Sequence, residues 1–356
     1  MKKNTSNLSF VDLYFANRKT GAKFLEDINK LIDFKKLEKL LEKHYKFKND
    51  AAGNIPWGAL LLFKINLLGM WYGLSDEELE MSVNDRFSFR TFVELPLDID
   101  CPDHSTIWRF RERMKNAQAW DLILASVNQQ LEDHKVIVKK GVNVDASITQ
   151  SPNKPKGAHR IIVAEDREED TRSENEKNEE DKFMQEIKLT QPCADTEGRW
   201  LKKGSKSFFG YKKHVCSTEE GLILAVHTTP ANESDTKNLE SVLEKCKLNP
   251  KVRVNTDKGY SSKQNRDYLK GKRLKSGIQH KANRGKPLGK LQQAFNNKIS
   301  KKRYTIERTF GSIKKWFTGG VAKYKGVERT HMQHVLEAIC YNLKVAPRII
   351  MSNTKN

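Results

Sequence analysis

Two kinds of segment are missing from this sequence of 356 residues: a long apolar run and a secretory leader. The longest apolar stretch, around Ala59–Tyr72, is interrupted by a lysine, an asparagine and a glycine, so it is too short and too polar to span a bilayer. Residues 1–10 contain two lysines but no apolar core of a signal peptide. We therefore expect a cytoplasmic protein without a membrane partner.

Closely spaced cysteines are missing as well. The chain has five cysteines, an odd number, and no two of them have the CxxC spacing of a zinc ribbon. Cys101 and His104 are three residues apart, but no second pair completes a metal site. This pattern favours reduced thiols in a cytoplasmic protein over structural zinc.

Acidic residues are too few to balance the basic ones. The chain has 65 Lys and Arg against 45 Asp and Glu, a formal charge of +20 and a pI near 9.6. Such an excess repels itself in a compact chain, and a polyanion would relieve the repulsion. Nucleic acid is the first candidate for this partner, and an anionic membrane surface is the second.

One segment runs against this trend. Residues 165–186 contain eleven acidic, four basic and few apolar residues, so they cannot bury enough surface to offset the entropy cost of ordering. We expect a disordered acidic insertion over residues 158–195. Because residues 165–186 carry a net −7, the rest of the chain carries +27.

The first 135 residues have helical periodicity. We expect N-terminal helices within residues 1–54 and a helical DNA-binding region over 55–135. In the latter region, Gly73 is a typical residue for ending a helix, and Ser75 with Glu78 forms a capping box that starts the next one. The short connections are compatible with a helix-turn-helix module.

A helix that begins near residues 103–105 is rich in arginine. Arg109 and Arg111 suit contacts with phosphates or guanine edges, so both are candidates for binding DNA. The alternative is a solvated basic face over a core formed by Ile107, Phe110 and Met114.

Beyond residue 135 the apolar residues alternate as they do in strands. Residues 142–148, 208–217, 222–229 and 252–255 are the predicted strands, with a hairpin turn at 219–221 and a helix at 235–248. This order predicts an α/β domain with a mixed sheet over residues 136–347, followed by a tail at 348–356.

Three carboxylates stand out from their surroundings. Residues 251–325 contain 22 Lys and Arg but only three acids, among them Asp257, just past a strand, and Glu307, on a helix predicted over 298–317. Asp145 ends the first strand. Each is unremarkable alone, because Asp257 could belong to a turn and Glu307 to a surface ion pair. Together, two strand-end aspartates and a helical glutamate could hold two divalent ions for phosphodiester chemistry.

Several segments, in the correct order over residues 55–347, resemble transposases of the insertion-sequence-five group within the insertion-sequence-four superfamily. Arg303, Glu307 and Lys314 match three positions of the Tyr-x2-Arg-x3-Glu-x6-Lys signature, whereas Ser300 stands at the tyrosine position. The other matching segments are Leu74-Ser-Asp-Glu-Glu, Pro102-Asp-His-Ser-Thr-Ile-Trp-Arg-Phe-Arg, Val144-Asp-Ala-Ser-Ile, Lys202-Lys-Gly-Ser-Lys-Ser-Phe-Phe-Gly-Tyr-Lys, Thr229-Pro-Ala-Asn-Glu-Ser-Asp and Thr256-Asp-Lys-Gly-Tyr.

The resemblance implies a ribonuclease H-like fold and a DDE transposase with Asp145, Asp257 and Glu307 as catalytic metal ligands. It further implies two Mg²⁺ or Mn²⁺ ions, binding to the terminal inverted repeats and target DNA, a homodimer assembled on DNA, and a location at the nucleoid. Water would attack first, and the freed 3′-hydroxyl would then attack the target. The residues expected to hold phosphates are Arg303 and Lys314, with Lys202, Lys203 and Lys206 as further candidates.

Two other functions stay open. One is a catalytically inactive relative that binds DNA as a repressor does. The other is a ribonuclease H-like nuclease that cuts DNA but does not join it.

Overall fold

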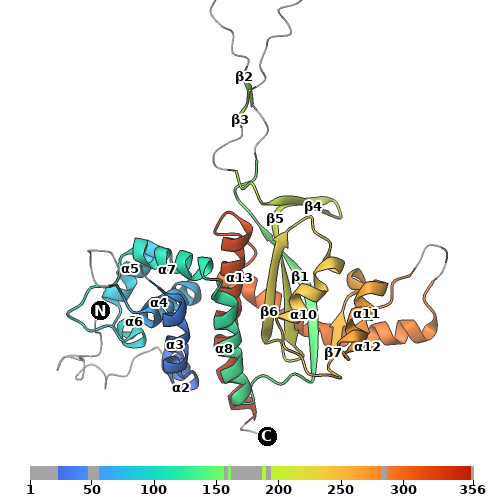
Figure 1. Cartoon of the computed structure of the whole chain (residues 1–356), viewed down its shortest axis with the longest axis horizontal. Coiled ribbons are helices and arrows are strands. Elements are labelled where there is room, and N and C mark those ends of the chain that lie inside the picture. The colour runs from blue at the N-terminus through green and yellow to red at the C-terminus, as the bar shows by residue number, and fades with distance from the viewer. Residues whose placement is uncertain are drawn as a thin grey trace, which may run out of the picture.

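The chain folds into an N-terminal set of helices and a mixed sheet flanked by helices (Figure 1). The computed structural model describes residues 23–46, 56–155, 159–161, 187–189, 194–282, 285 and 287–353. The N-terminal helices are α2 (Lys23–Leu31), α3 (Phe34–His44), α4 (Ala59–Tyr72), α5 (Asp76–Asp85), α6 (Phe87–Val93), α7 (His104–Asn116) and α8 (Trp120–Asp133). Among the described residues, no helix is both long and apolar enough to cross a membrane.

Helix α4 is the centre of the N-terminal region. It is buried on nearly all sides, and its one lysine, Lys64, is 1% exposed and ion-paired to Glu94 at 2.7 Å. Gly73 ends the helix in the left-handed conformation, and the capping box of Ser75 with Glu78 starts α5. Both predicted boundaries are confirmed. Helix α6 was not expected from the sequence.

Arg111 is not on the surface of α7. It is 5% exposed, and its guanidinium binds the carboxylate of Asp76 at the start of α5 and, at 2.9 Å, the side-chain amide oxygen of Asn66 on α4. The sequence prediction of a DNA contact at Arg111 is therefore wrong in this structure, because the side chain ties three helices together. Arg109 lies exposed on the same helix.

The sheet contains β1 (Gly141–Gln150), β4 (Arg199–Lys203), β5 (Lys206–Thr218), β6 (Ile223–Pro230), β7 (Arg253–Thr256) and β8 (Lys275–Ile278). Strand β5 is antiparallel to β1, β4 and β6, whereas β1, β7 and β8 are mutually parallel. The order β6-β5-β1-β7-β8 is the mixed arrangement of a ribonuclease H-like sheet, which confirms the expected fold class. The hairpin turn between β5 and β6 lies where it was predicted, with Gly221 at a φ of +100°.

Helices cover the sheet and extend beyond it. They are α10 (Leu239–Glu244), α11 (Lys263–Gly271), α12 (Lys290–Phe317) and α13 (Val327–Asn353), with short 3-10 turns η1 (Asp235–Asn238) and η2 (Lys258–Tyr260). Helix α12 starts eight residues earlier than predicted, and α13 continues into the segment expected to be a tail.

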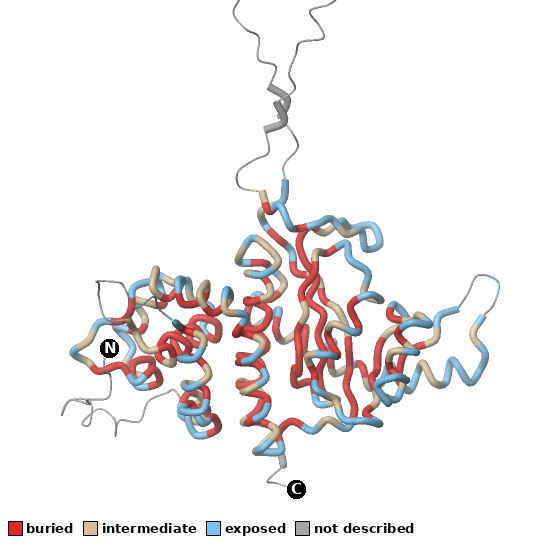
Figure 2. Tube along the Cα trace, viewed as in Figure 1, coloured by how far each residue is buried: buried red, intermediate tan, exposed pale blue. Residues whose placement is uncertain are grey.

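Helix α13 joins the two parts of the chain. It packs against β6 on one side and α8 on another (Figures 1 and 2). Asn342 on α13 donates to the side-chain oxygen of Asn128 on α8 at 2.8 Å and to the carbonyl of Ile223 on β6 at 2.7 Å. Because Asn342, Asn128 and Ile223 are all buried, the helices and the sheet share one continuous core.

The expected acidic insertion is largely outside the described residues, which omit 162–186 and 190–193. Two short strands within it, β2 (His159–Ile161) and β3 (Ile187–Leu189), pair antiparallel. Asp195, which the sequence placed at the end of the insertion, is instead 3% exposed and accepts hydrogen bonds from Tyr211 and Ser151. The folded domain therefore resumes before residue 195.

The role of Arg111 gives a stability prediction. Arg111→Ala leaves the Asp76 carboxylate and a buried amide oxygen without their partner, so we expect a loss of about 3 kcal/mol in the free energy of unfolding. Arg109→Ala on the exposed face should change it by less than about 0.5 kcal/mol. Urea unfolding of both variants measures the difference, and equal stabilities would contradict a structural role for Arg111.

Candidate active site

Parallel pairing brings two aspartates together at the sheet. In the register of β1 with β7, Val144 lies opposite Thr256, so the residues that follow them, Asp145 and Asp257, are neighbours. Asp145 lies in the middle of β1 and not at the strand end that the sequence predicted, because β1 continues to Gln150. Asp257 follows the last residue of β7, and its carboxylate accepts a hydrogen bond from the backbone N–H of Gly259 at 2.8 Å. This location past the carboxyl end of a strand is where open α/β sheets place reactive groups.

Two buried asparagines fix α12 against these strands. Asn255 on β7 donates to the side-chain oxygen of Asn143 on β1 at 3.1 Å, and Asn143 donates to the carbonyl of Lys302 on α12, also at 3.1 Å. Both are fully buried, so the bonds are shielded from competing water. They lie two residues before Asp145 and Asp257 and therefore set how α12 approaches the two carboxylates.

A repeated sequence pattern marks these two asparagines. The pattern Val-Asn-x-Asp occurs twice, at residues 142–145 and 254–257. Alternation along a strand places the asparagine and the aspartate on the same face. The same polar pair on two neighbouring interior strands indicates that the asparagines support the aspartates in the same way on both strands.

Glu307 completes a groove with the two aspartates. The groove has a volume of about 980 Å³, and Asp145, Asp257 and Glu307 all line it. Within the described part of the chain, no three His, Cys, Asp or Glu side chains lie close enough together to hold a metal ion. The three carboxylates therefore line one groove, but they are not close enough together to hold a metal ion between all three.

The guanidinium of Arg303 forms an ion pair with one of these carboxylates. Arg303 on α12 binds Asp145 at 2.7 Å, and their side chains are 10% and 20% exposed. Burial raises the pKa of Asp145 above its ordinary value, Arg303 opposes this rise, and the neighbouring charge of Asp257 adds to it. Two adjacent carboxylates in a half-buried site therefore attract positive charge.

Of the basic residues predicted to hold phosphates, three line the groove: Arg303, Lys314 and Lys203. Burial lowers the pKa of Lys314, and the charges of Lys213 and Lys203 lower it further. Lys202 and Lys206 are exposed on strands β4 and β5 but do not line the groove, and neither do Arg109 and Arg111 on α7.

A buried ion pair supports the part of the groove lined by Val321. Lys213 on β5 pairs with Glu337 on α13, with side-chain exposures of 2% and 1%. Gln333 links Glu337 to the carbonyl of Val321, which lines the groove. Sequence reasoning missed this network, because nothing local distinguishes a buried lysine from a surface one.

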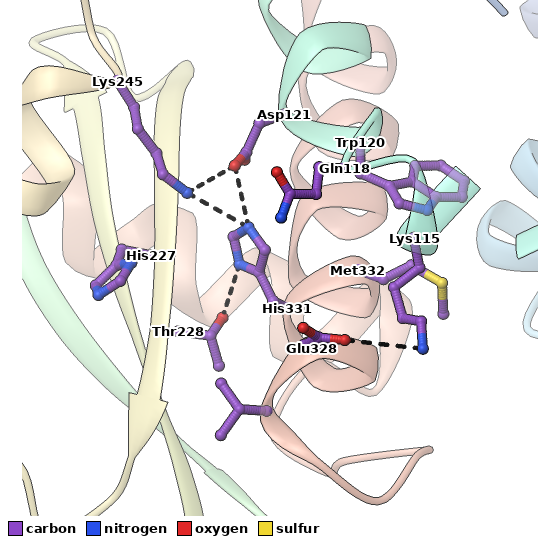
Figure 3. Close-up of a pocket in the computed structure, with 11 residues that line it drawn as sticks. Lys115, Gln118, Trp120, Asp121, His227, Thr228, Lys245, Glu328, His331 and Met332 are labelled. Carbon is purple, nitrogen blue, oxygen red and sulfur yellow. Dashed lines mark hydrogen bonds and ion pairs between the residues drawn. The ribbon is translucent and has the colours of Figure 1, made fainter. Parts of the chain in front are cut away.

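A second cavity, of about 370 Å³, lies between α8, β6, α10 and α13 (Figure 3). Asp121 there binds Lys245 at 2.6 Å and His331 at 3.2 Å. Burial alone would raise the pKa of Asp121, but its bonds to His331 and Lys245 outweigh burial and lower the pKa to about 2. The acid is satisfied by its own neighbours, so this cluster stabilises the junction of helices and sheet.

Comparisons with known proteins point in one direction. Residues 171–343 match the family model described as "Transposase DDE domain", and residues 14–113 match "Transposase domain (DUF772)". The transposase for insertion sequence element IS1106 of Neisseria meningitidis serogroup B is 33% identical over 245 residues, which cover 68% of this chain and 78% of that protein. The DDE-domain match contains Asp257 and Glu307 but begins after Asp145.

Two solved structures share far less with this chain. They are a crystal structure of the Mos1 strand transfer complex and a Mos1 transposase paired-end complex with the left transposon end. Each is 9% identical with a TM-score of 0.20, covering 89% and 90% of this chain and 85% and 86% of theirs. A likeness this small carries no argument.

Open space surrounds Gly311 on the side of α12 that faces the groove. It lines the groove in the middle of a helix, and a Cβ added there would meet no atom within 4 Å. Helix interiors favour alanine over glycine, so we expect Gly311→Ala to raise the free energy of unfolding by about 0.5–1 kcal/mol.

Gly69 on α4 is the matched control for Gly311. A Cβ at Gly69 would lie 2.9 Å from the Cδ2 atom of buried Leu79, so Gly69→Ala should gain less or lose stability. Thermal unfolding of both variants gives the comparison. A loss of stability in Gly311→Ala would show that the groove side of α12 is not open.

Proposed function

The chain belongs to the DDE transposases of insertion sequences, and we propose that it uses Asp145, Asp257 and Glu307 to cut and join DNA at the ends of its own element. The family catalyses DNA transposition and implies divalent metal ions. The observation that carries the proposal is the strand register, which makes the two aspartates neighbours on a groove that Glu307 also lines. The signature residues on α12 support membership of the insertion-sequence-five group.

The three carboxylates fit divalent cations. They supply the oxygen ligands that Mg²⁺ and Mn²⁺ prefer, and one of them, Asp145, already binds a cation in the form of Arg303. Two such ions, when bound, activate an attacking oxygen and stabilise a leaving one. In this proposal Asp145, Asp257 and Glu307 hold them.

The basic side chains of the groove take the substrate. Arg303, which is paired with Asp145, lines the groove together with Lys314 and Lys203. A guanidinium grips phosphate oxygens in a planar fork, whereas the lysines act as point charges. These residues would hold the scissile strand while water and then a freed 3′-hydroxyl attack.

Recognition of the terminal inverted repeats is assigned to the N-terminal helices. Helix α7 presents Arg109 on an exposed face, nearer its N-terminus than Arg111, and recognition helices direct their N-terminal part toward base edges. Lys202 and Lys206, exposed on strands β4 and β5, are further candidates for phosphate contacts. Assembly as a homodimer on DNA would bring the two ends of the element together.

Substitution of Asp257 tests the catalytic assignment. Asp257→Asn keeps the size of the side chain and the hydrogen bond from Gly259 but removes the charge a metal needs. We expect Mg²⁺-dependent cleavage of end DNA to fall by more than the roughly hundredfold loss typical of residues that only support metal ligands. Binding should stay within about threefold, because affinity comes mainly from phosphate contacts.

Asp267→Asn is the control for this test. Asp267 is an exposed acid on α11 within the same basic part of the chain, so its loss changes the charge equally without touching the groove. Full cleavage by Asp257→Asn would remove that residue from the site. A parent protein that binds but never cuts would indicate a repressor-like relative, and one that cuts but never joins would indicate a nuclease.

Arg109 tests the recognition helix. If it reads a guanine edge, Arg109→Ala should cost about 1–3 kcal/mol of binding on the proper end sequence and much less on random DNA. If it contacts only phosphate, both affinities should fall together and the salt slope by about one. Titrations at two salt concentrations, with the exposed Lys140→Ala as charge control, distinguish these cases. Unchanged binding would move recognition to another element.

A further inference from the structure

The proposed function gives no role to the N-terminal half of α12. The first buried residue of this helix is Ile299, so its first nine residues extend past the core, and Leu291 is 88% exposed (Figure 2). Helices in proteins are stabilised mainly by packing an apolar face. We call residues 290–301 the basic arm, because this segment contains three lysines and no acidic residue.

The charge of this segment is of one sign. The 39 residues between Asp267 and Glu307 contain 12 Lys and Arg and no acidic residue. On α12, Lys290, Lys301 and Arg308 are eleven and seven residues apart, which places them within about 20° of one another around the helix. Lys298 lies about 60° away on the same exposed side.

These four cations are exposed, and none of them forms an ion pair with a described acidic residue. The paired cations of α12 are the neighbouring ones, Lys302 with Glu219 and Arg303 with Asp145. A stripe of unpaired like charges repels itself, and a polyanion that lies along it relieves the repulsion. The stripe spans about 27 Å along the helix, over which duplex DNA presents about sixteen phosphate charges.

Hydrogen bonds hold the basic arm against the residues that follow β8. Asn296 exchanges two hydrogen bonds with His280, which follows β8, at 2.8 and 2.9 Å. Gln279 adds a bond to the hydroxyl of Ser300 at 2.7 Å. The stripe therefore has a fixed direction along α12. It leads from Arg308, which donates to the carbonyl of Glu220 in the β5–β6 turn at 3.2 Å, outward past the edge of the sheet.

We propose that the basic arm binds the target duplex, an inference that rests on the proposed function. The arm projects on the side of the sheet away from the N-terminal helices, to which we assign the element's ends (Figure 1). Lysines contact phosphates and carry no sequence information. A surface of this kind suits target DNA, whose sequence is not fixed, and it lies on the same helix that carries Glu307 into the groove.

The test is a triple substitution in the arm, Lys290→Gln, Lys298→Gln and Lys301→Gln. All three side chains are exposed, and glutamine is as good a helix former as lysine, so the fold is retained. The control is Lys135→Gln, Lys140→Gln and Lys247→Gln, which removes the same charge from exposed positions outside the arm.

Two kinds of measurement are made on the full-length protein: affinity for random and end duplexes at several salt concentrations, and the rates of cutting end DNA and of joining pre-cleaved ends to a target plasmid. We expect the arm variant to bind random duplex about tenfold more weakly, with a salt slope smaller by about 2.7, and to join ends more slowly while still cutting them. Affinity, salt slope and joining equal to those of the control would overturn the proposal, as would a loss confined to end DNA.

The failure of this inference is distinguishable from failure of the proposed function. If the parent protein does not cut end DNA, the transposase mechanism fails, while the random-duplex titration still decides whether the arm binds DNA. If the parent cuts and joins, and the arm variant does both equally well, only the arm assignment is wrong.

Discussion

The parallel pairing of β1 with β7 is the constraint on which the groove depends. One register, with Val144 opposite Thr256, makes Asp145 and Asp257 neighbours, and a slip by one residue would turn one of them to the other face of the sheet. The same register pairs Asn143 with Asn255, and Asn143 bonds to the backbone of α12. Strand pairing therefore places all three carboxylates, although they come from segments far apart in the sequence.

The two buried asparagines carry a cost that the register offsets in part. A buried amide without partners destabilises a fold, and here the amide nitrogen of each asparagine donates a hydrogen bond, whereas the side-chain oxygen of Asn255 has no partner among the described residues. Gly277 on β8 contributes to the fit, because a Cβ there would lie 2.6 Å from the side-chain oxygen of Asn255. The polar contact thus fixes helix α12 in one orientation rather than many.

Much of this architecture could be predicted from local pattern. The capping box at Ser75, the hairpin turn and the mixed α/β class were all confirmed, because each depends on neighbouring residues. Long-range partners could not be predicted. Arg111 looked like a surface residue of a basic helix until Asp76 and Asn66 were placed beside it. Likewise, Lys213 and Glu337 are 124 residues apart, and only the fold shows that both are buried.

The hydrogen bonds between Asn153, Ser151 and Asp195 have a consequence for changes in chain length. Asp195 donates its backbone N–H to the carbonyl of Asn153 at 2.8 Å, and its carboxylate accepts a hydrogen bond from Ser151 at 3.1 Å. The folded domain therefore holds these two points of the chain together by its own contacts. Doubling the number of residues between two such points costs only about 0.6 kcal/mol in closure entropy. The length of chain between Asn153 and Asp195 is therefore a weak constraint on the stability of the domain, whereas the register of β1 with β5 is a strong one.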